Sequence, residues 1–330
     1  MDKAILSAVL RRMERRRADH EAQAEQRRWE VVSSIPRIGQ IDRELKGTAI
    51  RAVRTAFASG EDSAASIEAL RVKNLALQQE KRELLARHGY PANYLAPVTD
   101  CEQCKDTGYV GSKLCECVRR QCAEEQTRQL STILPIESEN FSTFSLDYYS
   151  STADRRIGSS PRYAMENNLS ECRAFADEFG SHERNLLLYG STGLGKTFLS
   201  SCIARAVSEH GFSVAYDTAI SIFDHYNTVK FGGAAFEQSS AALEKYKNAD
   251  LLIIDDLGTE MTTSFTISSL YDLINRRLME HRPMIINTNL QPPMLEKRYS
   301  EAIASRILGQ FIQLRFLGTD IRKQKNAEII

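Results

Sequence analysis

The sequence predicts an α/β domain with a central parallel sheet, preceded by a helical domain that ends in a compact cysteine module. Three observations predict this organisation. Short apolar runs alternate with helical patterns in the second half of the chain, the first 87 residues have a helical composition, and four cysteines stand close together between these regions. A chain of 330 residues is also longer than one simple core requires, so we expect two domains.

The helical region covers residues 1–87, which are rich in Ala, Glu, Gln, Arg and Leu. Its apolar residues recur at spacings of three and four, which is typical of amphipathic helices. Breaks at Ser33–Pro36 and Ala58–Ser63 divide it into about three helices. The stretch Arg11–Arg17 has acidic residues interleaved and after it, which favours a solvated helix face over a phosphate-binding surface.

Five apolar runs predict the strands of the sheet. Runs of this length between helical segments are typical of parallel strands covered on both faces. They are Asn185–Tyr189, Ser213–Tyr216, Leu251–Ile254, Met284–Ile286 and Gln310–Phe316. The serine-rich segment 136–161 is the best linker candidate, so we expect domains at residues 1–135 and 162–330 with a linker at 136–161.

Charge and hydropathy exclude several protein classes. Lysine plus arginine and aspartate plus glutamate number 43 each, so no global field marks a nucleic-acid or membrane binder. No stretch approaches the roughly 18 apolar residues that a spanning helix needs. We therefore expect a cytoplasmic protein without a membrane partner, in which cysteines serve as thiols or metal ligands.

A glycine-rich octet follows the first apolar run and precedes a predicted helix at Phe198–Val207. It matches the phosphate-loop pattern G-x-x-x-x-G-K-[ST] at every position. Glycines let backbone N–H groups wrap around phosphates, and the helix start adds its positive end. Lys196 is expected to contact the β- and γ-phosphates, and Thr197 to offer its hydroxyl to Mg²⁺. The predicted ATP-binding residues are Gly190, Ser191, Thr192, Gly193, Leu194, Gly195, Lys196 and Thr197.

Two acids end the strand predicted at Leu251–Ile254. Asp255 is expected to hold Mg²⁺, and Asp256 is the candidate for activating the attacking water. The alternative, that the pair only caps a strand, is less favoured because a complete phosphate loop lies upstream. Together the two motifs predict an ATPase that releases ADP and phosphate.

A third motif, Met284–Asn289, is a predicted strand that ends in an asparagine. Asn289 can reach the γ-phosphate and orient the water if this strand lies beside the strand of Asp255. The alternative is that Asn287 and Asn289 are ordinary turn residues before Pro292.

Four cysteines form two close pairs, Cys101 with Cys104 and Cys115 with Cys117. Two such pairs of thiolates can close a tetrahedral Zn²⁺ site. We therefore predict structural zinc over free thiols, with Cys122 as a substitute ligand if Cys115 or Cys117 points away.

The order of these motifs, followed by an arginine-bearing helix and Gly318–Arg322, resembles the AAA+ superfamily. Within it, the stretches LLLYGSTGLGKT, IIDDLG and IINTNL look like the DnaC/DnaI/IstB branch of helicase loaders and transposition helper ATPases. The resemblance covers residues 185–322 and implies that Arg306 projects into a neighbouring subunit's ATP, while Arg322 acts in cis. Surface salt bridges are the alternative for both arginines. The helical lid that many AAA+ proteins carry is expected to be nearly absent.

Three functions are compatible with these features. The cysteine module, with Asp106–Val110 inside it, looks like the zinc-bearing amino-terminal domain of DnaI-type loaders. This favours a loader whose residues 1–135 grip the replicative hexameric DNA helicase, whose AAA+ domain holds single-stranded DNA, and which forms a homo-oligomer through Arg306.

An IstB-like transposition helper is the alternative, although such proteins usually have shorter amino-terminal regions without four cysteines. A nucleotide-gated adaptor with little turnover is disfavoured by the intact Lys196, Asp255 and Asp256. Lys230 with Phe231, and Arg276 with Arg277, are open candidates for DNA contact, but solvated helix residues explain them equally well.

Overall fold

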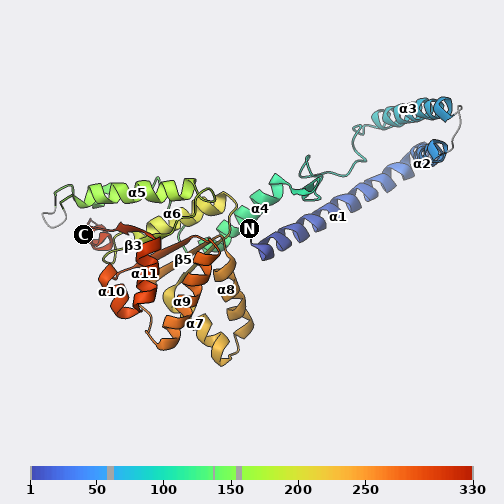
Figure 1. Ribbon diagram of the computed structural model, residues 1–330. Helices are drawn as coiled ribbons and strands as arrows, with labels where there is room; N and C mark the ends of the chain where they lie inside the picture. The colour runs from blue at the N-terminus through green and yellow to red at the C-terminus, as the bar shows by residue number, and fades with distance from the viewer. Residues whose placement is uncertain (1, 58–62, 137, 154–157, 329–330) are drawn as a thin grey trace. The chain divides into compact units, whose positions relative to one another are not determined.

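The computed structural model describes residues 2–57, 63–136, 138–153 and 158–328, and it contains two compact units (Figure 1). One unit is Leu10–Cys115, and the other joins Met1–Val9 with Glu116–Ile330. The functional boundaries at residues 135 and 162 stay predictions. Within the described ranges, no helical segment combines bilayer-spanning length with an apolar sequence.

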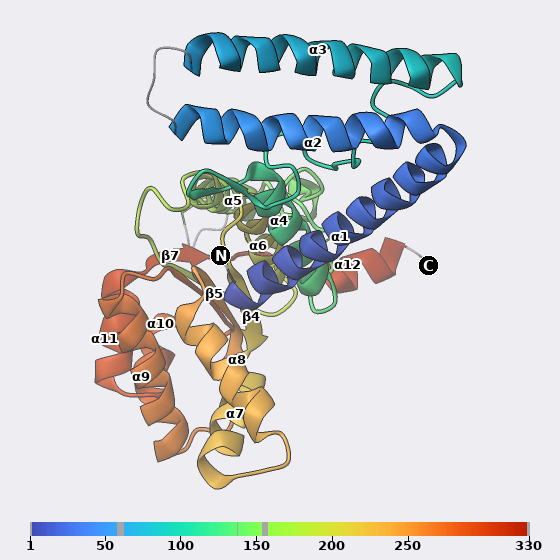
Figure 2. The ribbon, with the colours of Figure 1, turned by 90° about the vertical axis from the view of Figure 1, so that its right-hand side faces the viewer.

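Three helices form most of the amino-terminal region, as the sequence predicts. They are α1 (Lys3–Ser34), α2 (Pro36–Phe57) and α3 (Ser63–Arg87). Pro36 opens α2, where its missing N–H leaves no hydrogen bond unmade. Residues 58–62 of the second predicted break lie outside the described residues. Figure 2 shows α2 and α3 side by side, and Asp42 of α2 accepts hydrogen bonds from Arg28 of α1 at 2.6 Å and Lys81 of α3 at 2.7 Å.

The second unit contains a five-stranded parallel sheet of order β4-β5-β6-β3-β7. The strands are β3 (Leu186–Tyr189), β4 (Val214–Thr218), β5 (Leu251–Leu257), β6 (Met284–Thr288) and β7 (Ile312–Arg315). Each overlaps one of the predicted apolar runs, and β4, β5 and β6 extend a few residues beyond theirs. The predicted parallel sheet is therefore confirmed.

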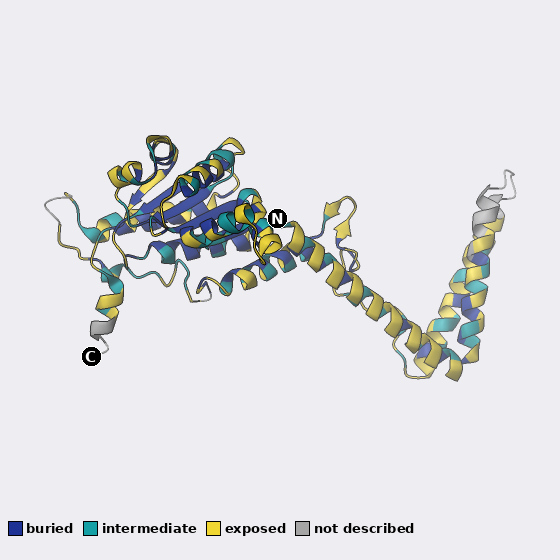
Figure 3. Cartoon of the chain, turned by 90° about the horizontal axis from the view of Figure 1, so that it is seen from below, coloured by how far each residue is buried: buried dark blue, intermediate teal, exposed yellow. Residues whose placement is uncertain are grey.

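Helices cover both faces of this sheet, and Figure 3 shows the buried strands between their more exposed outer surfaces. Leu186 and Leu188 belong to one core and Leu187 to the other, because successive strand side chains point to opposite faces. The first core is packed by α4 (Glu116–Ser131), α5 (Pro161–Asp177), α6 (Lys196–Glu209), the 3₁₀ turn η1 (Leu146–Tyr148) and α12 (Ile321–Glu328). The second is packed by α7 (Ala219–Phe231), α8 (Phe236–Asn248), α9 (Ser264–Met279), α10 (Pro292–Arg298) and α11 (Glu301–Gln310).

The sheet order brings three predicted motifs to one edge. β6 lies between β3, which leads into the phosphate loop, and β5, which carries the two acids. The carboxyl ends of parallel strands meet at the same edge, where ligands of open α/β sheets bind. The condition set for Asn289, that its strand lies beside that of Asp255, is therefore met.

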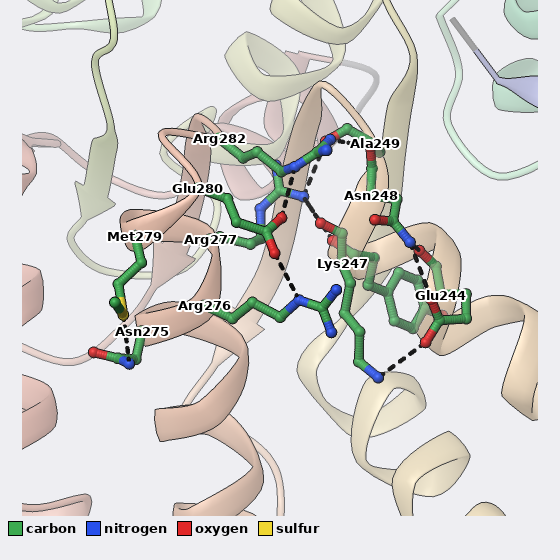
Figure 4. Close-up of polar contacts among 11 residues, drawn as sticks. Glu244, Lys247, Asn248, Ala249, Asn275, Arg276, Arg277, Met279, Glu280 and Arg282 are labelled. Atoms are coloured by element: carbon green, nitrogen blue, oxygen red, sulfur yellow. Dashed lines mark hydrogen bonds and ion pairs between the residues drawn. The ribbon is translucent and has the colours of Figure 1, made fainter.

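A buried arginine connects several segments at the opposite edge of the sheet, where strands β5 and β6 begin. Arg277 of α9 is fully buried and donates hydrogen bonds to backbone carbonyls that end α8 and precede β5 and β6, several of which Figure 4 draws. The acceptors are the carbonyl oxygens of Tyr246, Lys247, Ala249, Asp250 and Pro283. Arg277 is therefore closed to DNA.

Candidate functional site

The loop between β3 and α6 adopts a backbone that only glycine tolerates at two positions. Gly195 has a φ of 89° and directly precedes Lys196, the first residue of α6. Gly193 has a φ of 72°, and an added Cβ would lie 1.9 Å from a carboxylate oxygen of Asp320. Any side chain at Gly193 would therefore both strain the backbone and collide.

Lys196 is turned into this loop and is only 6% exposed. Its Nζ donates to the carbonyl oxygens of Gly190 at 2.8 Å and Ser191 at 2.7 Å, and to Oδ1 of Asn289 at 2.8 Å. Burial lowers the pKa of Lys196, while the nearby Asp256 and Asp255 oppose that shift. The bond to Asn289 joins the phosphate loop to the end of β6.

Asp255 is buried and accepts hydrogen bonds at both carboxylate oxygens. Oδ2 accepts from Thr197 Oγ1 at 3.0 Å and from the Tyr216 hydroxyl at 2.6 Å. Oδ1 accepts from Asn287 Nδ2 and from the backbone N–H of Asp256, both at 2.9 Å. These donors fix the orientation of the carboxylate and bring it to Thr197, its predicted partner in holding Mg²⁺.

Asp256 occupies a different environment from its neighbour. The register of β5 against β6 shifts here, and Asp256 adopts a left-handed φ of 51°, which aspartate tolerates better than most residues. Its side chain is half-buried and lines the cavity described below. Burial and the charge of Asp255 raise the pKa of Asp256, and Lys196 and Arg322 oppose that rise.

A cavity of about 550 Å³ lies over the loop. Its volume falls within the range of about 300–1,000 Å³ typical of small-molecule sites. The polar and charged residues that line it include Lys196, Thr197, Asp256, Asn289 and Arg322. Its lining also includes Pro135, Glu139, Thr143, Phe144, Ser145, Tyr148, Ile321 and Lys325, together with Thr192, Gly193, Leu194 and Gly195 of the phosphate loop.

The two predicted arginines differ in position. Arg322 is exposed at the start of α12 and lines the cavity. Arg306 lies on α11 and does not line it. Its guanidinium sits over the Tyr271 ring at 4.5 Å, donates to the Tyr271 hydroxyl at 2.7 Å and donates to Asn275 Oδ1 at 3.0 Å. Its proposed action on a neighbouring subunit stays a prediction.

The four predicted zinc ligands come together around a small hairpin. β1 (Tyr109–Val110) pairs antiparallel with β2 (Lys113–Leu114) and returns the chain between the two cysteine pairs. The sulfurs of Cys101, Cys104, Cys115 and Cys117 all lie within 4.8 Å of one another, and Cys101 and Cys115 are 3.7 Å apart. Zinc–sulfur bonds of about 2.3 Å place tetrahedral sulfurs at a similar separation, so this cluster can bind zinc.

Two further residues lie close to the cysteine cluster in the sequence, Asp106 and Cys122. Asp106 accepts hydrogen bonds from the N–H groups of Asp100 and Cys101, both at 2.9 Å, and so supports the first cysteine pair. Cys122 is buried on α4 and does not belong to the four-sulfur group.

Several residues of the site escape sequence reasoning. Tyr149 donates its hydroxyl to the Leu194 carbonyl at 2.9 Å beneath the phosphate loop, and Phe144 packs beside Gly195. Tyr216 and Asn287 orient Asp255. Asn287 lies fully buried in β6, although its sequence position also suits a turn. Of these residues, only Asn287 could have been suspected from the sequence, because it lies in the predicted strand Met284–Asn289.

Comparison with known proteins agrees with these motifs. Residues 164–328, half of the chain, match the family described as IstB-like ATP binding protein. The chain is 30% identical over 152 residues to the chromosomal replication initiator protein DnaA of Campylobacter jejuni subsp. doylei, a match that covers 46% of this chain and 32% of that protein. It is 27% identical over 142 residues to the replicative helicase loader DnaC of Escherichia coli K12, covering 43% and 57% respectively.

A crystal structure of the DnaC helicase loader aligns with 56% of this chain and 99% of its own, at a TM-score of 0.45 and 20% identity. The chain thus spans between a third and about three fifths of the length of the two curated relatives. Because the family match covers the strands, the phosphate loop and both acids, the chain belongs to the IstB-like ATP-binding family, within the DnaC/DnaI/IstB branch of AAA+ proteins.

Proposed function

We propose that this protein hydrolyses ATP in the cavity above the phosphate loop. The observation that carries the proposal is that Lys196, Thr197, Asp256 and Asn289 line one cavity, and that Asp255 accepts a hydrogen bond from Thr197 beside it. These residues come from α6, β5 and the end of β6, so only the folded sheet assembles them. A phosphate-binding cation, a metal-holding pair and a cavity-facing carboxylate are what phosphoryl transfer to water requires.

Each side chain has a role that its contacts support. Lys196 exchanges its bonds to loop carbonyls for phosphate oxygens, and Asn289 is released to orient the attacking water. Thr197 and Asp255, which are hydrogen-bonded to each other, would hold Mg²⁺, and the ion would neutralise phosphate charge. Asp256 accepts a proton from the water because it is the carboxylate that faces the cavity. Arg322 lines the same cavity and acts in cis on the phosphates.

Binding of a fluorescent ATP analogue to the full-length chain tests this function. We expect binding that requires Mg²⁺, release of phosphate from ATP, and loss of affinity by about tenfold or more in Lys196→Ala because the main phosphate contact is gone. Lys245→Ala removes an exposed lysine of α8 and serves as the control. A wild-type chain that neither binds nor hydrolyses ATP would refute the proposal.

We further propose that the protein loads the replicative DNA helicase. The similarity to a replicative helicase loader and to a replication initiator supports this role. The helical region and the four-cysteine cluster lie outside the family match and are our candidates for binding a partner. Residues 1–135 contact the helicase, and zinc bound by the four thiolates fixes the fold of the cysteine segment. The proposed homo-oligomer places Arg306 of one copy at the ATP of the next.

A basic and aromatic cluster supports the proposed contact with single-stranded DNA. The Lys230 ammonium lies 3.9 Å from the centroid of the Phe265 ring, and the neighbouring Phe231 is 73% exposed. Exposed aromatic rings beside a cation are typical of surfaces that stack bases and contact phosphates.

A transposition helper is the second candidate, because the matching family is named after IstB. The immobilised full-length chain, incubated with the hexameric helicase of the same organism and with single-stranded or duplex DNA, separates the two. A loader retains the helicase and prefers single strands. Preference for duplex DNA without helicase retention would favour the transposition role.

A further inference from the structure

The backbone turn that follows β5 determines where Asp256 points. Among the described residues, the Asp256 carboxylate has no hydrogen-bond partner, so its direction depends on its own backbone. That backbone is held in a tight turn, in which Thr259 donates its N–H at 3.2 Å and its hydroxyl at 2.8 Å to the Asp256 carbonyl oxygen. Gly258 within the turn has a φ of 108°.

A buried carboxylate fastens this turn from behind. Glu260 Oε2 accepts a hydrogen bond from the Gly258 N–H at 2.9 Å, and Oε1 accepts one from the Tyr299 hydroxyl. The Glu260 side chain is only 3% exposed, and Arg298 Nε lies 3.8 Å from Oε1. Arg298 also donates to the Glu260 carbonyl oxygen at 2.5 Å. A carboxylate is buried in a protein only when hydrogen bonds and a nearby positive charge compensate it, so these partners hold Glu260 in one position.

The partners of Glu260 stand on a firmly packed element. Arg298 is the last residue of α10, and Tyr299 is its C-cap. Leu295 of the same helix is fully buried, and Tyr299 is 4% exposed. Glu260 therefore connects the turn to a part of the core that cannot shift without losing packing.

We propose that Glu260 is a positioning residue of the ATPase site, whose carboxylate ties the turn beginning at Asp256 to the end of α10 and so sets the direction of the Asp256 side chain. This inference rests on the proposed ATP hydrolysis. Glu260 is not a catalytic residue, because it does not line the cavity and its side chain is closed to solvent.

Glu260→Gln in the full-length chain tests the proposal. A glutamine keeps the shape but loses the charge opposite Arg298, and it has one amide oxygen for two donors. We expect the turnover number to fall about tenfold while affinity for a fluorescent ATP analogue stays within about twofold, because the phosphate loop is untouched. Glu296→Gln makes the same change at an exposed position of α10 and should leave both values unchanged.

Tyr299→Phe keeps the proposal testable if Glu260→Gln fails to fold. It removes one hydrogen bond from Glu260 and leaves the charge pair, so we expect a two- to fivefold lower turnover number with unchanged affinity. A normal turnover number in folded Glu260→Gln, with only the melting temperature lowered, would overturn the inference, as would a normal turnover number in Tyr299→Phe. Failure of the wild-type chain to hydrolyse ATP would instead refute the proposed function.

Discussion

Asp255 and Asp256 are neighbours in sequence, but the fold gives them opposite surroundings. Asp255 is 3% exposed and accepts hydrogen bonds from Thr197, Tyr216, Asn287 and the backbone. These donors fix the orientation of its carboxylate beside Thr197. Asp256 faces the cavity, and burial raises its pKa. This difference in surroundings is the reason we propose Asp256, and not Asp255, as the proton acceptor.

Replacing Asp256 separates binding from hydrolysis. We expect Asp256→Asn to bind the ATP analogue normally and to hydrolyse ATP about 100-fold more slowly, because a general base typically contributes 10²–10⁴-fold. Phosphate release and analogue binding measure the two effects. Asp224→Asn, an exposed position on α7, is the matched control. An equal loss of affinity and rate would contradict the assigned role.

The raised pKa of Asp256 also predicts a pH dependence. A general base works only when it is ionised, so hydrolysis declines as the pH falls through that pKa. Because the pKa is raised, the decline begins at a higher pH than for an ordinary aspartate. The pH profile of the turnover number in the wild-type chain measures this. An acid limb at the ordinary aspartate pKa would argue against Asp256 as the base.

Gly193 gives a test of the loop backbone. Gly193→Ala places a Cβ against Asp320 and forces alanine to a left-handed φ, which costs about 1–2 kcal/mol before the collision is counted. We expect weaker ATP-analogue binding. Gly309→Ala, on α11 with open space around the added methyl group, should leave binding unchanged. Equal affinity in both variants would show that the loop relaxes around the clash.

Sequence predicts a site residue when its role leaves a local pattern. Lys196 and Thr197 belong to a contiguous motif, and the two acids end an apolar run, so these positions could be found without the fold. Tyr216 and Tyr149 could not, because they meet Asp255 and Leu194 across 39 and 45 residues of chain. Such pairs depend on strand order and packing, and an isolated tyrosine gives no sign of them.

At the scale of elements, apolar runs predicted all five strands of the parallel sheet, because strands covered on both faces form short continuous apolar runs. The short hairpin strands β1 and β2 have no such run, and the sequence did not predict them. The segment 136–161 was harder. Its serines indicate a linker, yet Phe144, Tyr148 and Tyr149 pack against the first core. Aromatic residues in an irregular segment have no period, so their burial could not be read from spacing.

Arg277 provides an element-scale test of stability. Arg277→Met leaves several buried carbonyl oxygens without a donor, among them those at the end of α8, which Figure 4 shows, and that of Pro283 before β6. We expect a loss of at least about 3 kcal/mol in the free energy of unfolding, since each unsatisfied buried group costs about 1–3 kcal/mol.

The neighbouring Arg276 is the control for this measurement. Its half-exposed pair with Glu280 at 3.0 Å is a surface interaction worth under about 1 kcal/mol. Urea unfolding of Arg276→Met and Arg277→Met compares the two. Similar losses in both variants would show that the carbonyl contacts add little.

At the scale of the whole molecule, the proposed oligomer shares its active sites between copies. Mixing Lys196→Ala with Arg306→Ala chains should restore about a quarter of the wild-type rate, because random pairing gives that share of interfaces an intact site and an intact arginine. Phosphate release from the mixture, compared with each variant alone, measures the recovery. No recovery, with normal hydrolysis by Arg306→Ala alone, would remove Arg306 from the reaction.

Loss of zinc should leave the ATP site intact, because none of the four clustered cysteines lines the cavity over the phosphate loop. We expect Cys104→Ser to lose bound zinc and helicase retention while its affinity for the ATP analogue stays normal. Metal analysis of the purified full-length chain measures the zinc. Ser112→Ala, an exposed position in the same hairpin, should retain it. Full zinc content in Cys104→Ser would exclude this cysteine as a ligand.

Two aromatic residues upstream of the sheet support the phosphate loop: Phe144 packs beside Gly195, and Tyr149 donates its hydroxyl to the Leu194 carbonyl. These contacts matter for any attempt to move the nucleotide site into another protein. A transplant of residues 162–328 alone would carry the phosphate loop and the strand ends but leave behind Phe144 and Tyr148, which line the same cavity, and Tyr149, which bonds to the loop. A chimaeric protein meant to keep this cavity would therefore have to take in residues upstream of the matched range 164–328 as well.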